Sequence, residues 1–272
     1  MSFLTLEKIS HHYFSDKNYT KALDHISCSI KEGEFVSILG PSGCGKSTVL
    51  SIIAGIIQPT KGKVLLKNEP ISETKLAIGY MLQQDYLFPW KTIIENVILG
   101  PKIAKTLSKQ TEEQGLKLLE EVGLTDVAEA YPDSLSGGMR QRASLVRTLI
   151  TNPEILLLDE PFSALDYLTK LKLENLVSKL LKTYNKTAVL VTHDIGEAIS
   201  MSDRIILMDS GPGTIANVFE VPIELREETP FLVRRHPKYQ GLFDKIWTEL
   251  NKNEEMSSTK VRQEQHVTEN GS

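Results

Sequence analysis

The chain has little of what marks secreted, membrane-spanning or nucleic-acid-binding proteins. Its 272 residues include only two cysteines, Cys28 and Cys44, so no disulfide framework is expected and a reducing compartment fits. No stretch approaches the roughly 18 to 20 uninterrupted apolar residues that span a bilayer, and residues 1–8 lack the basic start and apolar core of a signal peptide. The formal net charge of −4 gives no electrostatic reason to expect a nucleic acid. We therefore expect a cytoplasmic protein, for which any role at a membrane comes through a partner.

What is present is an ordinary globular composition, with 40% hydrophobic residues, enough for a substantial core in one large domain or two. The first third alternates short apolar segments with turn signals. We expect strands at residues 3–9, 26–30, 35–39, 63–67 and 78–82. One helix, beginning after Lys46, interrupts them, and from about residue 90 to 151 the pattern becomes helical, so we expect a helical insert.

Strand patterns return after this insert. Unbroken apolar runs at 155–158 and 187–192, separated by a helical stretch at 169–182, are typical of a parallel sheet buried on both faces. A hairpin at 204–208 and 214–221 follows. The sequence turns polar and charged after Leu250, and we expect residues 251–272 to be a disordered tail.

A glycine-rich segment lies between the apolar run 35–39 and the expected helix. It reads Gly40-Pro41-Ser42-Gly43-Cys44-Gly45-Lys46-Ser47-Thr48. This strand, loop and helix fit the phosphate-binding pattern of Gly, four residues, Gly-Lys-[Ser/Thr]. Backbone N–H groups and the helix N-terminus surround an anion, Lys46 adds a charge toward the β- and γ-phosphates, and Ser47 offers its hydroxyl to Mg²⁺. The segment predicts a nucleoside triphosphate ligand; the plainer alternative is a glycine-rich turn with a solvated lysine.

Two acidic residues end the apolar run 155–158, at the strand edge where ligands of open α/β sheets collect. We expect Asp159 to hold Mg²⁺ through water and Glu160 to polarise the water that attacks the γ-phosphate. Without a phosphate loop upstream, such residues could equally be solvated acids at a strand end.

A second anion-binding helix start is predicted in the helical region. Ser136 is a natural N-cap before a helix pattern that runs to Ile150, and Gly137 and Gly138 permit close backbone approach. Since one triphosphate already has a loop at 40–48, we expect this second start to serve a γ-phosphate bound by another subunit. Taken alone, it could be an ordinary capped helix.

The motif Leu135-Ser136-Gly137-Gly138-Met139 resembles the signature of ATP-binding-cassette ATPases, and the other motifs of that family occur in the expected order from Phe3 to about Met208. The resemblance implies an α/β fold: a P-loop NTPase, RecA-like core with an antiparallel β subdomain and an inserted α-helical signature subdomain. It implies that residues 40–48 are the Walker A loop and 156–160 the Walker B strand, with Glu160 as catalytic carboxylate.

The resemblance also implies roles for four further residues. Gln83 matches the glutamine that senses Mg²⁺ and the transmembrane partner, with Gln84 beside it. Asp166, in Ser163-Ala164-Leu165-Asp166, belongs to the loop that crosses the dimer interface, and His193 matches the switch histidine that contacts the γ-phosphate. Tyr13 lies where the family places an aromatic residue on adenine, although Tyr13, Phe14 and Tyr19 share a loop-like region where an aromatic could equally be packing filler.

The apolar, aromatic segment 85–97 lies where the strand-rich part meets the helical insert, and exposed aromatics there would suit a protein partner. The alternative is that Phe88 and Trp90 belong to the core of the insert. The Leu87-Phe88-Pro89-Trp90 form is similar to that of cassette subunits of nitrate, sulfonate and taurine importers, as is the C-terminal part that contains Arg234-Arg235-His236-Pro237 and Ile246-Trp247.

Taken together, the motifs predict an ATP- and Mg²⁺-dependent ATPase subunit, and the resemblance implies that it serves an importer of a small anionic solute. Residues 1–221 would form the ATPase domain, with the insert at about 90–151, and 222–250 a helical extension. Expected partners are a membrane permease, a second cassette subunit and, through the complex, an extracytoplasmic solute-binding protein, at the cytoplasmic face of the membrane and without nucleic acid. The alternatives are a cassette ATPase acting as a mechanical switch in DNA repair or translation, and a small-molecule kinase.

Overall fold

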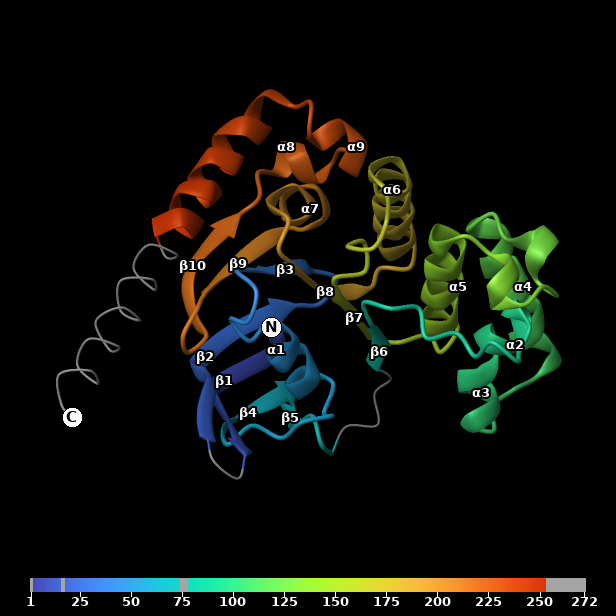
Figure 1. Cartoon of the computed structure of the whole chain (residues 1–272), viewed down its shortest axis with the longest axis horizontal. Helices are drawn as coiled ribbons and strands as arrows, with labels where there is room; N and C mark the ends of the chain where they lie inside the picture. Colours follow the sequence, from blue (N-terminus) through green and yellow to red (C-terminus); the bar gives the residue numbers. More distant parts are fainter. Residues whose placement is uncertain (1, 16–17, 74–77, 253–272) are drawn as a thin grey trace. The chain divides into compact units, whose positions relative to one another are not determined.

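The computed structural model describes residues 2–15, 18–73 and 78–252. The chain divides into two compact units, whose helices and strands are labelled in Figure 1. Unit 1 comprises Met1–Thr74 and Val191–Ser272, and unit 2 comprises Lys75–Leu190. Within the described ranges, no helix has both the length and the apolar character that crossing a membrane requires. The predicted disordered tail falls almost entirely on residues 253–272, outside the described part.

Unit 1 contains a four-stranded sheet of order β2-β1-β4-β5, in which neighbouring strands are antiparallel. Its strands are β1 (Ser2–Ser15), β2 (Asn18–Lys31), β4 (Lys61–Leu66) and β5 (Glu69–Pro70). Leu4 and Leu6 alternate along β1 and are buried as the period-2 pattern requires, and Ile9 is buried beyond a register shift. The sheet is the antiparallel β part that the sequence predicts.

The loop predicted around the aromatic residues Tyr13, Phe14 and Tyr19 is wrong. These residues lie on β1 and β2, where Tyr13 pairs with Thr20 and Phe14 with Tyr19. The Phe14 and Tyr19 rings are 5.6 Å apart, a cross-strand aromatic pair of the kind that stabilises hairpins. The strand pattern is hidden in the sequence because β1 contains register shifts that break strict alternation.

Unit 1 also contains β3 (Phe35–Leu39), which pairs in parallel with β9 (Arg204–Asp209), and β10 (Thr214–Glu220), which pairs antiparallel with β9. The predicted hairpin at 204–221 is therefore confirmed. The helices of this unit are α1 (Lys46–Ile53), α7 (Ile195–Met201), α8 (Ile223–Arg226), α9 (Pro230–Val233) and a helical stretch at 237–252. Helix α7 shows no amphipathic period, because all seven of its residues are buried; its one local signal is the N-cap Asp194 three residues before Glu197.

Unit 2 contains β8, β7 and β6 in that order in one sheet, with β6 and β7 parallel as the apolar runs predict. The strands are β6 (Ile78–Met81), β7 (Ile155–Asp159) and β8 (Thr187–Thr192), whose last two residues belong to unit 1. The helices are α2 (Ile93–Val97), α3 (Leu99–Ile103), α4 (Lys109–Glu121), α5 (Gly137–Leu149) and α6 (Tyr167–Thr183), with two 3₁₀ turns at Thr125–Val127 and Pro132–Ser134.

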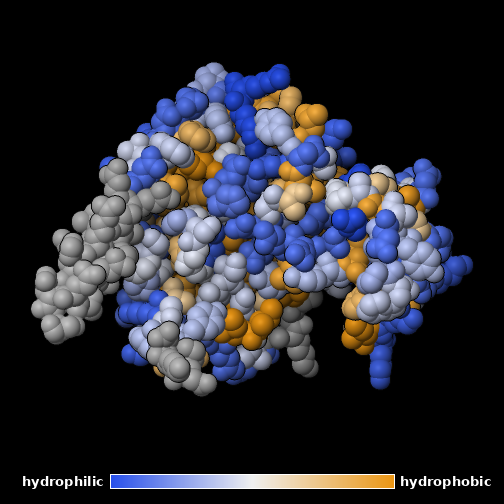
Figure 2. All heavy atoms as spheres, in the orientation of Figure 1, coloured by the Kyte–Doolittle hydropathy of each residue, from blue (hydrophilic) through white to orange (hydrophobic). Residues whose placement is uncertain are grey.

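Hydrophilic residues dominate the face drawn in Figure 2, and hydrophobic residues form only small separate patches on it. Scattered apolar residues are normal on a protein surface, so only patches that have a further structural feature point to a binding site.

Candidate functional site

The phosphate loop of unit 1 is built as the motif requires. Strand β3 is buried along its whole length, and α1 begins at Lys46, where Val49 N–H makes the first helical hydrogen bond to Gly45 O at 2.9 Å. Gly45 has φ +94°, and a Cβ there would lie 2.6 Å from Leu23 Cδ2. Only glycine meets both demands, because L residues rarely adopt this conformation and no space exists for a side chain.

Lys46 lies across this loop. Its side chain is 5% exposed, and Nζ donates hydrogen bonds to the carbonyl oxygens of Gly40 and Pro41, both at 2.8 Å. The ammonium group is thus held among backbone groups of the loop that it would serve, which favours the phosphate-binding interpretation over that of a solvated lysine.

The Cys44 thiol points away from solvent. The residue is fully buried, and burial raises its pKa, against an opposing effect of the nearby Lys46 charge. The thiol is therefore protonated near neutral pH, and of this residue the backbone is what a ligand in the loop can reach.

Tyr13 lies beside the loop. Its hydroxyl is 3.3 Å from Thr48 Oγ1, and its ring, which is 44% exposed, meets the His11 ring edge-on at 4.6 Å. A ring so exposed contributes little to a core, so the packing alternative explains it less well than a stacking role.

His193 follows β8 directly and is exposed. The next residue, Asp194, caps α7: its Oδ1 accepts Glu197 N–H at 3.1 Å, and its own N–H donates to Thr192 Oγ1 at 3.0 Å. The Thr192 hydroxyl in turn donates to the buried Glu197 carboxylate. The backbone on both sides of His193 is thus anchored.

The two acidic residues of unit 2 end β7, as predicted. The Tyr80 hydroxyl donates to Asp159 Oδ2 at 3.3 Å. Glu160 has φ +45°, a strained conformation for a residue with a side chain, and its carbonyl oxygen accepts hydrogen bonds from both N–H and Oγ–H of Ser163, at 3.2 and 3.0 Å. Such strain is characteristic of functional sites.

Gln83 is joined to this acidic turn. Its Nε2 donates to Ser163 Oγ at 3.1 Å, so Ser163 links Gln83 with Glu160. The sequence does not assign Ser163 this bridging role, because the bond joins residues 80 positions apart.

The predicted second anion-binding helix start is present in unit 2. Ser136 caps α5, with Oγ accepting Met139 N–H at 3.4 Å. A Cβ on Gly138 would overlap Thr169 Cγ2 of α6, so the two helices approach closely there. Asp166 caps α6 by accepting Thr169 N–H at 3.1 Å, and its hydrogen bonds to Thr169 lower the pKa of its carboxyl. The structure therefore brings the signature turn and Asp166 together around Thr169.

Residues 83–91, here called the docking segment, are held by side chains of α5. Gln141 Nε2 donates to Gln83 O at 2.9 Å, Arg140 Nε to Asp85 Oδ2 at 3.0 Å, and Arg147 to the carbonyl oxygens of Asp85 and Tyr86 at 2.6 and 2.7 Å. Burial lowers the pKa of Arg147, with Asp85 opposing the shift. These links were not predicted, because a helical period indicates which face is buried but not its partner.

The docking segment presents three aromatic side chains to solvent. Trp90 is 69% exposed, Tyr86 59% and Phe88 37%, and the Phe88 and Trp90 rings are 5.2 Å apart. The alternative that Trp90 belongs to the core of the insert is therefore wrong.

Asn96 of α2 fixes the backbone of the docking segment through hydrogen bonds. It is fully buried; its Nδ2 donates to the carbonyl oxygens of Phe88, Lys91 and Thr92 at 2.9 to 3.2 Å, and its Oδ1 accepts Phe88 N–H at 2.7 Å. Thr92 and Glu95 form a capping box at the same helix start, which is the one sequence signal for this turn.

Asn96→Asp is expected to lower the free energy of unfolding by about 3 kcal/mol, because a carboxylate oxygen would replace the NH₂ group that faces three carbonyl oxygens. Urea denaturation measures the effect. The matched control is Asn152→Asp: Asn152 is exposed, and its Oδ1 accepts Lys186 Nζ at 2.7 Å, a bond that aspartate keeps. Equal stability of the two variants would contradict the role of Asn96.

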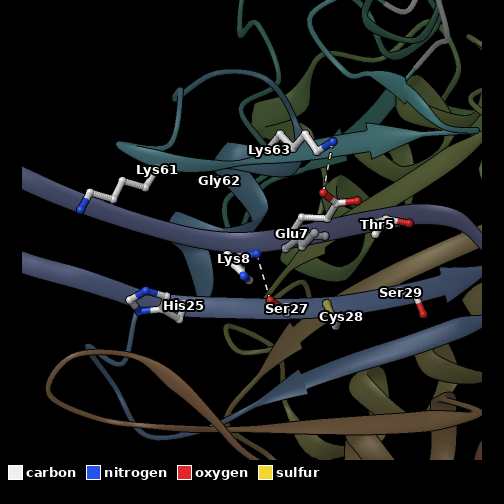
Figure 3. A pocket seen from close by; sticks show the side chains of 11 residues that line it. Thr5, Glu7, Lys8, His25, Ser27, Cys28, Ser29, Lys61, Gly62 and Lys63 are labelled. Carbon is white, nitrogen blue, oxygen red and sulfur yellow. Dashed lines mark hydrogen bonds and ion pairs between the residues drawn. The ribbon is translucent and has the colours of Figure 1, made fainter.

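A hollow of about 890 Å³ lies on the antiparallel sheet of unit 1 (Figure 3). Its lining comes from β1, β2 and β4 and includes Lys8, Lys61 and Lys63, the last paired with Glu7 at 3.2 Å. It contains none of the predicted site residues.

The predicted site residues thus divide between the units. Unit 1 contains Tyr13, residues 40–48 and His193, whereas unit 2 contains Gln83, Asp159, Glu160, Asp166 and Ser136–Gly138. In the part of the chain that the structure describes, no three His, Cys, Asp or Glu side chains are grouped as a metal site. Of the residues predicted to hold Mg²⁺, Ser47, Gln83 and Asp159 all offer oxygen atoms, which this ion prefers.

Comparison with known proteins agrees with the motifs. Residues 23–163 match the family model described as ABC transporter. An uncharacterized ABC transporter ATP-binding protein of Bacillus subtilis is 58% identical over 251 residues, covering 92% of this chain and 96% of that protein. The taurine import ATP-binding protein of Roseobacter denitrificans is 37% identical, covering 91% of this chain and 95% of that protein.

The solved structures include a dimeric ATP-binding cassette in a post-hydrolysis state, bound to ADP and Pi. It has a TM-score of 0.69 and 36% identity, and covers 80% of this chain and 99% of that chain. This likeness, with the parallel and antiparallel sheets described above, confirms the predicted α/β P-loop NTPase fold.

Proposed function

The chain belongs to the ABC transporter family and is an ATP-binding, ATP-hydrolysing subunit, and from this premise we propose that it drives uptake of a small anionic solute through a separate membrane permease. The observation that carries the proposal is the docking segment, where three exposed aromatic side chains stand on a backbone held by α5 and Asn96. A rigid, aromatic surface is what a protein partner recognises.

The proposed mechanism is a dimer that closes on ATP and reopens after hydrolysis. Each ATP would lie between residues 40–48 of one chain and Ser136–Gly138 of the other, an arrangement supported by the two anion-binding helix starts and by the dimeric ADP- and Pi-bound relative. Closure of the dimer can shift the conformational equilibrium of the transporter only as far as the affinity for nucleotide differs between the two states of the transporter.

Within this site we assign each residue a role. Residues 40–48 bind the phosphates, Tyr13 stacks on adenine, and Asp166 contributes across the interface. Mg²⁺, when bound with ATP, would neutralise phosphate charge; Ser47, Asp159 and Gln83 would hold it. Glu160 would polarise the attacking water, while His193 contacts the γ-phosphate and Gln83 reports the state of the permease.

The proposed class of solute and the proposed direction of transport both rest on resemblance to importer subunits. The taurine import relative and the Leu87-Phe88-Pro89-Trp90 form support an importer of the nitrate, sulfonate and taurine type, with an extracytoplasmic solute-binding protein and a peripheral location at the cytoplasmic face of the membrane. We also propose that residues 1–221 form the ATPase domain, with the helical insert at about 90–151, and that 222–250 are an added extension. The family match favours a transporter subunit over a soluble mechanical switch.

The test is to purify the tagged chain from membranes of cells that express it from its own locus. A permease and a solute-binding protein should co-purify with it, and their identities would give the solute. Trp90→Ala is expected to reduce permease recovery at least tenfold, the scale of a buried aromatic anchor, while ATPase activity of the isolated subunit stays within about twofold.

The chain provides a matched control, because its only other tryptophan, Trp247, is also exposed, at 51%, but lies in the C-terminal helical stretch. Trp247→Ala should leave permease recovery unchanged. Loss of recovery in both variants, or in neither, would count against the docking segment.

A further inference from the structure

The C-terminal residues beyond β10 cover α7, the helix that begins two residues after His193. Residues 237–252 present Leu242, Phe243 and Ile246 to a buried cluster that includes Ile195 and Ile199 of α7. Val233 of α9 and Leu225 of α8 join the same cluster. The side of α7 that packs in this cluster is therefore covered by residues of the C-terminal extension.

The cluster also reaches the phosphate loop. Leu39, the residue immediately before Gly40, belongs to it and is fully buried. The extension consequently packs behind two segments of unit 1 that the proposed function assigns to the nucleotide: the end of β3 and the start of α7.

Polar groups of the extension meet the first turn of α7 at Gly196. A Cβ placed on Gly196 would lie 3.0 Å from Asp194 Oδ1, 3.1 Å from the Tyr239 hydroxyl and 3.6 Å from Arg234 Nε. These three groups therefore surround one point at the helix start. Arg234 is itself held, because one of its guanidinium nitrogens donates to Pro230 O at 3.1 Å.

Asp194 follows His193 in the chain, and two hydrogen bonds fix its position. Its carboxylate accepts Glu197 N–H, and its N–H donates to the Thr192 hydroxyl. A shift of the Asp194 carboxylate would move the capping turn and with it the adjacent backbone of His193. A displacement of about 1 Å can cost an enzyme on the order of 100-fold in rate, so the position of this turn matters to catalysis.

We propose that the C-terminal extension positions His193, with Arg234 and Tyr239 as the positioning residues that act through Asp194 and the first turn of α7. This inference rests on the proposed role of His193 at the γ-phosphate. It assigns to the extension a part in ATP hydrolysis.

The experiment is a double-mutant cycle on the full chain, with steady-state hydrolysis of radiolabelled ATP as the readout. Arg234→Ala is expected to lower kcat about tenfold and Tyr239→Phe about threefold, both with an unchanged KM for ATP, because the loop at 40–48 is untouched. Tyr239→Phe keeps the ring in the apolar cluster and removes only the hydroxyl.

The decisive comparison uses His193→Ala, which is expected to cost about 100-fold, the scale for one lost donor to a developing charge. Added to His193→Ala, neither Arg234→Ala nor Tyr239→Phe should reduce kcat further, because residues that act through His193 lose their effect with it. A merely structural role would instead give additive losses.

The matched control is Arg235→Ala. Arg235 adjoins Arg234 but is exposed, with its guanidinium 4.7 Å from the centre of the Phe231 ring. Its removal should leave kcat unchanged. Unchanged kcat in Arg234→Ala and Tyr239→Phe, or additive losses in the His193→Ala background, would overturn the inference, whereas full activity of His193→Ala would overturn the proposed role of His193 itself.

Discussion

Glu160→Gln is expected to reduce ATP hydrolysis by about 100-fold or more while ATP binding is retained, because a general base is lost but the phosphate loop is not changed. Glutamine has nearly the same shape as glutamate. The strained backbone at this position is held by Ser163 through the Glu160 carbonyl oxygen, which the substitution keeps. Steady-state release of phosphate and equilibrium binding of ATP measure the two effects separately.

The same variant tests the proposed dimer. With hydrolysis blocked, ATP should hold two chains together, and size-exclusion chromatography with light scattering should show a dimer only when ATP is present. Glu154→Gln, which changes a carboxylate just before the same strand, provides the control and should behave as wild type. Unchanged turnover in Glu160→Gln would remove Glu160 from its role, and a variant that binds ATP but stays monomeric would contradict the dimer.

Lys46→Ala is expected to weaken ATP binding by about 100-fold and to abolish measurable hydrolysis. The removed ammonium group is nearly fully buried among the loop carbonyls, so its charge acts on phosphate with little solvent screening. Titration with a fluorescent ATP analogue measures the affinity. The melting temperature without nucleotide should be recorded as well, since Gly40 O and Pro41 O each lose a donor.

Lys61→Ala is the control for charge alone. Lys61 belongs to the same unit and carries the same charge, but it lies exposed on β4 and lines the hollow on the antiparallel sheet. Its removal should leave ATP affinity within about twofold, as expected for screened surface charge. Similar losses in the two variants would mean that general electrostatic attraction, and not the loop, binds the nucleotide.

Much of the fold could be predicted because its signals are local. Apolar runs identified β3, β7 and β8, and the pattern Gly, four residues, Gly-Lys-[Ser/Thr] identified the loop before α1, where the structure gives Gly45 a positive φ. The failures are equally physical. Strand β1 was predicted too short because its register shifts break the alternation, and α7 was missed because it is buried on every side.

The residues of the candidate site could be predicted from the sequence, but the contacts between them could not. Each of its motifs combines a helix start or a strand end with polar side chains, and both features can be recognised in a short stretch of sequence. The sequence did not reveal the hydrogen-bonding roles of Ser163, Arg147 and Asn96, which act on backbone groups or side chains of other segments. No local pattern marks such a residue, since its role depends on what the fold places beside it.

The sequence by itself determined the nucleotide chemistry of this protein, because a phosphate-binding loop, an acid-terminated strand and a capped signature helix depend on φ/ψ preferences and capping groups that neighbouring residues supply. Only the tertiary structure decided which aromatic residues of the docking segment face solvent and that Arg234 and Tyr239 lie at the helix after His193. Those outcomes depend on packing between residues distant in the chain, where burial and hydrogen-bond partners are chosen by the whole fold.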